Sequence, residues 1–322
     1  MHAAQVLEWG QAPKYVEVTT PHPPPADSDL IQLKLIVSGL HRVAISRASG
    51  KHFSANTLPH TPGIDGIGEI VSLPTNNPSN FSLGQKVFFF TWASTGGAYK
   101  EILTFPYEDV TPIPEGADPI QIAGLLNPAM SSWMALRKRT TNLPPNFTVL
   151  IMGATSASGT IAIDLCRHLG AGKIIGLARN IKKLDELALD QRIELEEVVE
   201  ETDFKGLGQV DVILDYVYGK PTAHLLATME VSARRGTQYV QIGSLAGLEM
   251  ELPSAILRSK NLTIRGSAPG AWSIGYLKGE LPGLVTAMGS LKRMDVKAVR
   301  LSEIENIWAR LGTSTERIVV VP

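Results

Sequence analysis

The hydrophobic and polar positions of this chain follow one pattern up to about residue 119 and another beyond it. In the first part, short apolar segments are separated by turns rich in Pro and Gly, and residues 30–37 partly alternate between apolar and polar, as a half-buried strand does. Gly63, Gly66 and Gly68 interrupt another such segment, which is typical of bulges or close backbone approach. We therefore predict a mostly antiparallel β domain here.

Beyond residue 119, compact apolar segments alternate with helical patterns. These segments do not alternate between apolar and polar residues, which is typical of strands in a parallel sheet that is covered on both faces. The rhythm stops after residues 262–267, and the rest of the chain would suit a return to the first domain. The predicted strands of the parallel sheet are residues 148–152, 173–177, 210–214, 238–242 and 262–267.

Residues 149–170 follow the order strand, small-residue turn, helix. Nothing bulkier than threonine lies between Gly153 and Gly159, so a pyrophosphate can approach the backbone amides and the positive end of the helix. The usual G-x-G-x-x-G spacing is absent because Ser156 stands where the middle glycine would be, and a plain strand–helix turn is the alternative. The predicted phosphate-binding residues are Gly153, Ala154, Thr155, Ser156, Ala157, Ser158 and Gly159.

The end of the next predicted strand indicates which dinucleotide binds. In an NAD site, an acidic residue about 20 positions after the turn accepts hydrogen bonds from the ribose hydroxyls. Here the strand ends with Arg179 and Asn180 and has no acid, and the planar, permanently charged guanidinium suits a 2′-phosphate. Lys182 and Lys183 would add to the positive field. We therefore predict NADPH; the alternative is an ordinary surface arginine at the start of a helix.

Composition and charge mainly exclude partners. The 322 residues suffice for two domains with a core each. The net charge of −1, from 30 basic and 31 acidic side chains, predicts binding neither to nucleic acid nor to an anionic membrane. Without a signal-peptide pattern or a membrane-length apolar run, we expect a cytoplasmic protein. The one cysteine, Cys166, allows no intramolecular disulfide, and its place on the apolar face of a helix predicts an inert core residue.

Eight segments spread over nearly the whole chain together resemble a known family. They are residues 61–68 and 83–87 in the first part, then 153–159, 169–172, 178–180, 215–219, 239–244 and 265–267. In this order they resemble the zinc-independent, quinone-oxidoreductase-like branch of the medium-chain dehydrogenase/reductase superfamily. The resemblance implies an α/β fold, with a GroES-like domain formed by residues 1–119 and 268–322 and an inserted Rossmann domain of residues 120–267. It also implies a homodimer, formed through the last Rossmann strand near residues 262–266.

The resemblance also bears on metal binding. Zinc-dependent members of the superfamily place a Cys, a His and often a second Cys at positions that correspond here to His41, Ile64 and Asn127. Ile64 cannot bind zinc, and His41 alone cannot hold a catalytic ion that needs three protein ligands. One cysteine cannot form a structural zinc lobe either. We predict that the protein holds no zinc.

Without zinc, the charge that develops during hydride transfer must be met by hydrogen-bond donors. His41 and Arg42 follow a bend at residues 37–39 and could face the substrate cleft, where a histidine can donate to an oxyanion and deliver a proton. A histidine bonded within a turn is the alternative. Zinc-free quinone reductases often have Asn and Asp at the positions of His41 and Ala44, so their substrates do not transfer directly. Ser131 matches a family Thr near the nicotinamide, and could instead cap a helix.

Other candidate residues follow the later strands. Tyr218 should lie near the cofactor groove because ligands collect at the carboxyl ends of parallel strands. Trp92 and Tyr99 are candidates for the substrate mouth, although packing inside the β domain is favoured. By resemblance, the nicotinamide end is held by stretches that include Ile242, Gly243, Ser244 and Ser267.

Together these features favour an NADPH-dependent reductase that transfers hydride to a hydrophobic, conjugated carbonyl compound: a quinone, an enone or an enoyl thioester. A non-catalytic NADPH-binding sensor or structural protein on the same fold is an alternative, because a fold does not guarantee chemistry. A specialised biosynthetic ketone or enoyl reductase is another.

Overall fold

Both ends of the chain contribute to the same unit of the fold. The computed structural model describes residues 1–52, 55–75, 81–91, 96–309, 311 and 316–322, and Trp92 lies outside them. One compact unit consists of Met1–Asn127 and Leu281–Pro322, and the other of Pro128–Glu280. The boundaries between the two units fall inside the helices α2 (Pro119–Lys138) and α7 (Ile274–Ser290). No helix in the described ranges combines the length and the apolar character that a membrane crossing requires.

The unit built from both chain ends is mostly antiparallel sheet, as predicted. Its main sheet has the strand order β14-β15-β3-β4-β5-β7, and β6 pairs with β3 beside this path. The long strand β3 (Leu30–Gly39) pairs antiparallel with β4 (Asp65–Ser72) and with the C-terminal strand β15 (Arg317–Val321). The other elements of this unit are β1 (His2–Gln5), β2 (Lys14–Glu17), α1 (Arg42–Ala48), β5 (Lys86–Phe90), β6 (Ile102–Pro106), η1 (Tyr107–Asp109), β7 (Val110–Pro112), β14 (Val296–Arg300), η3 (Leu301–Glu303) and α8 (Ile304–Trp308).

The unit of Pro128–Glu280 is a doubly wound parallel sheet. Its six strands are all parallel and follow the order β10-β9-β8-β11-β12-β13, which is 3-2-1-4-5-6 when numbered from β8, the order of the Rossmann fold. The predicted α/β fold class is therefore confirmed. Its elements are β8 (Thr148–Met152), α3 (Ala157–His168), β9 (Lys173–Ala178), α4 (Ile181–Asp185), β10 (Gln191–Glu194), η2 (Val199–Glu201), β11 (Val212–Asp215), α5 (Lys220–Thr228), β12 (Thr237–Gln241), α6 (Ser254–Ser259) and β13 (Leu262–Gly266).

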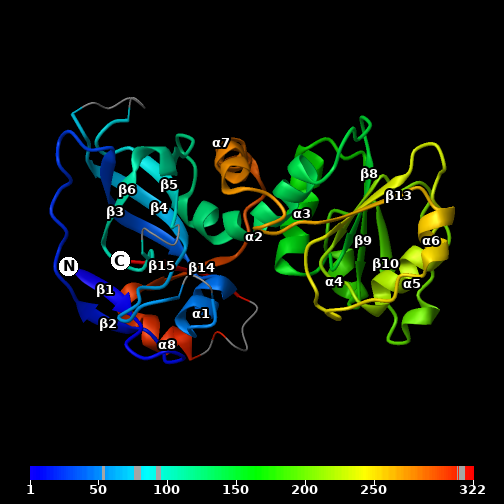
Figure 1. Cartoon of the computed structure of the whole chain (residues 1–322), viewed down its shortest axis with the longest axis horizontal. Helices are drawn as coiled ribbons and strands as arrows, with labels where there is room; N and C mark the ends of the chain where they lie inside the picture. Colours follow the sequence, from blue (N-terminus) through cyan, green and yellow to red (C-terminus); the bar gives the residue numbers. More distant parts are fainter. Residues whose placement is uncertain (53–54, 76–80, 92–95, 310, 312–315) are drawn as a thin grey trace. The chain divides into compact units, whose positions relative to one another are not determined.

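Two apolar cores cover the two faces of this parallel sheet. Successive residues of β8 alternate between them: Val149 and Ile151 join one core, and Leu150 and Met152 join the other. Residues of α3 and α4 complete the first core, whereas α5 and α6 contribute to the second, so helices flank the sheet on both sides (Figure 1). The continuous apolar strands of the sequence have this cause, since a strand covered on both faces has no solvent-facing positions.

Cys166 belongs to the first of these cores. Its side chain is fully buried in α3, and this burial raises the pKa of its thiol. A thiol that stays protonated is a poor nucleophile, which agrees with the predicted inert role.

Candidate functional site

A tight turn joins β8 to α3. Gly153 adopts a φ of 84°, a left-handed conformation that favours glycine, and its amide donates to the carbonyl oxygen of Leu177 at 2.7 Å. Ser156 caps α3: its hydroxyl accepts a hydrogen bond from the amide of Gly159 at 3.1 Å. The strand, turn and helix predicted from the sequence are therefore present, and Ser156, which replaces the middle glycine of the usual motif, acts as the N-cap.

The predicted cofactor-binding residues follow five neighbouring strands at one edge of the parallel sheet. Because all strands run the same way, their carboxyl ends meet at this edge. At a spacing of about 4.8 Å between strands, the four steps from β9 to β13 span roughly 19 Å. In sheet order, Arg179 and Asn180 follow β9, the Gly153–Gly159 turn follows β8, Tyr218 follows β11, Ile242, Gly243 and Ser244 follow β12, and Ser267 follows β13.

Arg179 lies exposed at one end of this row. Within the described part of the chain, no hydrogen bond or ion pair engages its guanidinium. The next residue, Asn180, caps α4 by accepting the amide of Lys183 on Oδ1 at 3.1 Å. Arg179 thus precedes the cap of a short helix, and its charge is available to an anion.

Asp215, at the end of β11, organises the middle of the row. Its carboxylate is fully buried, and Oδ1 accepts the amides of Val217 and Tyr218 at 2.7 and 2.9 Å. Oδ2 accepts the hydroxyls of Thr222 and Tyr239 at 2.5 and 2.7 Å. Burial and the neighbouring carboxylate raise the pKa of Tyr239, so the phenol remains a donor. These contacts hold Tyr218 in a left-handed conformation, with φ of 58°, which a non-glycine residue adopts only when its surroundings fix it.

We expect Asp215→Asn to destabilise the parallel-sheet unit. The amide cannot accept four hydrogen bonds in this arrangement, so buried donors lose their partner, at a cost of about 2–4 kcal/mol. A loss of that size lowers the melting temperature by roughly 5–10 °C, which differential scanning calorimetry would measure. Asp185→Asn, at a side chain that is 65% exposed, should leave the melting temperature nearly unchanged. Equal melting temperatures for the two variants would contradict the assigned role of Asp215.

Ser131 lies inside α2, so the alternative that it caps a helix is wrong. Its hydroxyl donates to the carbonyl oxygen of Pro128 at 2.7 Å and lies 3.2 Å from the hydroxyl of Tyr216. Burial raises the pKa of Tyr216, which keeps that phenol protonated. Sequence reasoning did not single out Tyr216 as a partner of Ser131, because 85 residues separate the two in the chain.

His41 is bonded across the sheet and not within its own turn. Its Nε2 lies 3.1 Å from Oδ1 of Asp65, the first residue of β4, and its side chain is only 5% exposed. The alternative of a histidine bonded within a turn is therefore wrong. Arg42 begins α1 next to His41, and its side chain is exposed. Tyr99, a sequence candidate for the substrate mouth, is fully buried in the core, which confirms the packing alternative.

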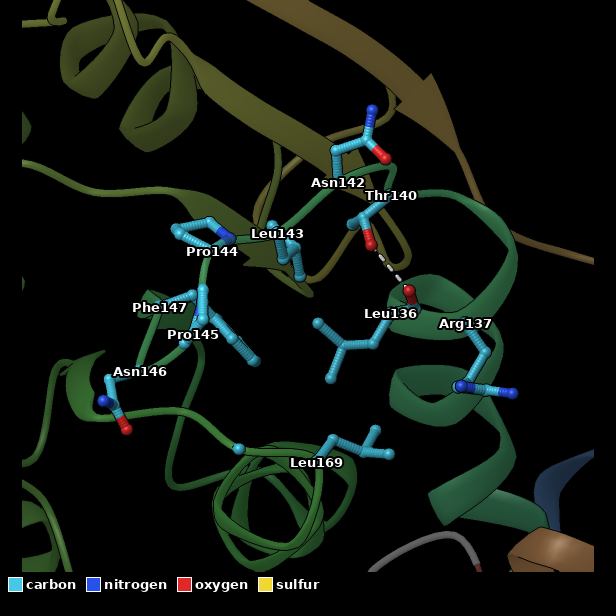
Figure 2. Close-up of a pocket in the computed structure, with 11 residues that line it drawn as sticks. Leu136, Arg137, Thr140, Asn142, Leu143, Pro144, Pro145, Asn146, Phe147 and Leu169 are labelled. Carbon is cyan, nitrogen blue, oxygen red and sulfur yellow. Dashed lines mark hydrogen bonds between the residues drawn. The ribbon is translucent and has the colours of Figure 1, made fainter.

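Two cavities lie at opposite edges of the parallel sheet. The one in Figure 2 has a volume of about 560 Å³ and is lined by the segment that precedes β8 and by the end of α3, so it faces the amino ends of the strands. The other, of about 400 Å³, includes Tyr218, Gln241 and Ser244, and therefore opens at the carboxyl ends. Only the second cavity belongs to the row of predicted cofactor-binding residues.

Comparison with known proteins extends from one domain to the whole chain. The model of the alcohol dehydrogenase GroES-like domain matches residues 27–115. The chain is 32% identical to the probable NADPH-dependent quinone reductase tdiC of Emericella nidulans, over 100% of both proteins. Among solved structures, AibC has a TM-score of 0.83 at 20% identity, covering 100% of this chain and 96% of that one. A mycobacterial protein complexed with NADPH has a TM-score of 0.74 at 17% identity, covering 100% of both.

Proposed function

Because the chain belongs to the quinone-oxidoreductase-like branch of the medium-chain dehydrogenase/reductase superfamily, we propose that it is an NADPH-dependent reductase of a hydrophobic, conjugated carbonyl compound. The acceptor class is a quinone, an enone or an enoyl thioester. The observation that carries this proposal is the row of predicted cofactor-binding residues along the strand ends of a Rossmann sheet. The similarity to a fungal quinone reductase over the full length of both proteins supports it.

The residues present fit NADPH. The turn at Gly153–Gly159 leaves no room for a further side-chain atom at Gly159, whose added Cβ would lie 2.3 Å from the carbonyl oxygen of Gly153. Such a turn brings backbone amides close to a pyrophosphate. Arg179 supplies a cation for the 2′-phosphate, and Asn180 lies beside it. Tyr218 would pack beside the nucleotide, and the stretches with Ile242, Gly243, Ser244 and Ser267 would hold the nicotinamide end.

When bound, NADPH supplies the hydride. The chain's own residues then have to orient the acceptor and neutralise the charge that forms on it. We assign these roles to His41, Arg42 and Ser131: His41 gives a proton, Arg42 contributes positive charge, and the hydroxyl of Ser131, on turning away from the carbonyl oxygen of Pro128, donates to an acceptor oxygen. The contact with the buried hydroxyl of Tyr216 supports a fixed position for the oxygen atom of Ser131.

The reaction we propose is independent of zinc. Ile64, at the position of a zinc ligand in metal-dependent members, has no atom that binds a metal. The neighbouring His41 is already paired with Asp65.

We also propose a cytoplasmic homodimer that binds neither nucleic acid nor a membrane surface. The near-neutral net charge of −1 supports the absence of such partners. Among the described residues, no strand pairs with the outer edge of β13, which supports a dimer built through that strand. β13 ends the sheet and exposes Ile264, which is 38% accessible. Size-exclusion chromatography with light scattering would test the dimer.

The test of the proposed function is NADPH oxidation, followed at 340 nm, with a panel of quinones, enones and enoyl thioesters. We expect turnover with at least one class and a clear preference for NADPH over NADH. Tight NADPH binding without turnover on any acceptor would favour the non-catalytic sensor or structural protein. Turnover with enoyl or ketone substrates alone would favour the specialised biosynthetic reductase.

A further inference from the structure

A buried carboxylate lies directly against the imidazole of His41. The Nε2 atom of His41 is 3.1 Å from Oδ1 of Asp65, whose side chain has no exposed surface. His41 comes just after β3, and Asp65 is the first residue of β4. The antiparallel pairing of these strands brings together two residues that are 24 positions apart. The pair is thus a property of the tertiary fold.

Neighbouring backbone contacts fix the geometry of this pair. The hydroxyl of Ser38 donates to the carbonyl oxygen of Asp65 at 2.6 Å, which ties the start of β4 to the end of β3. The imidazole occupies the space that a side chain at residue 39 would fill: a Cβ added to Gly39 would lie 2.0 Å from Nε2 of His41. The hydroxyl of Tyr99 donates to the carbonyl oxygen of Gly39 at 3.0 Å. The ring therefore lies against the backbone of Gly39, with Nε2 at Asp65.

The hydrogen bonds of the Asp65 carboxylate distinguish this pair from a structural ion pair. Oδ2 of Asp65 is buried without a hydrogen-bond partner in the described part of the chain. A merely structural buried carboxylate should have both oxygens satisfied. The nearby guanidinium of Arg47 donates instead to Gly63 and Thr91. Asp65 thus makes its one side-chain hydrogen bond to His41.

The second ring nitrogen of His41 is free to act. No hydrogen bond engages Nδ1 within the described residues, and Nδ1 is not among their buried, unpaired polar atoms. It therefore reaches solvent, although the side chain as a whole is only 5% exposed. One ring nitrogen on a carboxylate and the other open is the arrangement in which a carboxylate fixes the tautomer and orientation of a catalytic histidine.

We propose that Asp65 is a positioning residue that holds His41 so that Nδ1 delivers the proton of the reduction. This inference rests on the proposed function. In the step, the acceptor gains a hydride supplied by NADPH and a proton from Nδ1 of the imidazolium. His41 is left neutral, with its Nε2 proton still donated to Asp65, and Nδ1 then takes a new proton from water.

The charges around the dyad explain why the carboxylate matters. Arg42 is the next residue in the chain, and Arg47 lies on the same helix and interacts with Asp65 through its charge. The charge of Arg42 also reaches Arg317 on β15. The phenol of Tyr99 is neutral because burial, and then the charge of Asp65, raise its pKa. Asp65 thus places a negative charge directly against His41, in a part of the fold that also holds two arginines.

Asp65→Asn tests the positioning role. We expect kcat to fall at least tenfold with KM for the quinone and Kd for NADPH within about twofold of wild type, because binding does not use the carboxylate. The alkaline limb of the kcat profile should move to lower pH by about one unit, because the protonated ring loses its anionic neighbour. Asp211→Asn is the matched control: Asp211 is 5% exposed and paired with Arg235. It should leave the pH profile in place.

A measurement on the unmodified protein avoids any folding defect of the variant. With ¹⁵N-labelled histidine and no cofactor bound, the neutral ring of His41 should carry its proton on Nε2. A proton on Nδ1 instead would overturn the proposal, as would an unchanged kcat and pH profile in Asp65→Asn. Both outcomes differ from failure of the proposed function, in which the wild-type protein would not oxidise NADPH with any of the acceptors.

Discussion

Replacing Arg179 with Asp is expected to weaken NADPH binding about 100-fold, whereas NADH binding should change by less than about threefold. The guanidinium is exposed directly after β9 and has no partner in the described part of the chain, so its charge is available to a 2′-phosphate. A hydrogen bond to a charged group contributes about 1.5–3 kcal/mol, and the carboxylate of the variant would also repel the phosphate. NADH has no 2′-phosphate and loses neither contribution.

The measurement is the dissociation constant of each cofactor by fluorescence titration at one ionic strength, since salt weakens such contacts. Arg234→Asp makes the same change of charge at an exposed arginine before β12, at the opposite edge of the sheet. It should leave both constants within about twofold of wild type. Equal losses for NADPH and NADH in Arg179→Asp would contradict the phosphate contact.

The sequence predicted those parts of the fold that depend on neighbours in the chain. The strands β8, β9 and β11 are largely apolar segments because helices cover both faces of their sheet. The strand β10 was missed, since only Ile193 of its four residues is buried and the segment is otherwise polar. As the edge strand of the sheet, it gains its conformation from pairing with β9. Pairing of that kind leaves little trace in local sequence.

The candidate site likewise has parts that the local sequence predicted and parts that only the tertiary structure brings together. The turn after β8 and the residues after β9 were visible because each lies within a few positions of a predicted strand. The partners of His41 and Ser131 were not visible, since Asp65 and Tyr216 lie 24 and 85 residues away and meet them only through tertiary structure. One local signal existed for Asp65: a carboxylate in an apolar and glycine-rich segment has to find a buried partner.

Replacing Gly159 with Ala is expected to open the phosphate-binding turn and to weaken NADPH and NADH alike, each by about 100-fold. The added Cβ would lie 2.3 Å from the carbonyl oxygen of Gly153 and 2.8 Å from the Cα of Ala154. Both are backbone atoms of the turn itself, so the contact cannot be relieved by a side-chain rotation. Overpacking of this kind costs about 1–3 kcal/mol in stability. It also displaces the amides that would face the pyrophosphate, which is common to both cofactors.

Fluorescence titration and the melting temperature of the cofactor-free protein would measure the two effects separately. Gly279→Ala is the matched control, because Gly279 lies in α7 with nothing within 4 Å of an added Cβ. Alanine favours a helix over glycine by about 1 kcal/mol, so this variant should melt no lower than wild type and bind both cofactors normally. If Gly159→Ala kept its affinity for both cofactors, the pyrophosphate would not lie on this turn. The loss of both cofactors in this variant, beside the loss of NADPH alone in Arg179→Asp, would assign the turn to the pyrophosphate and Arg179 to the 2′-phosphate.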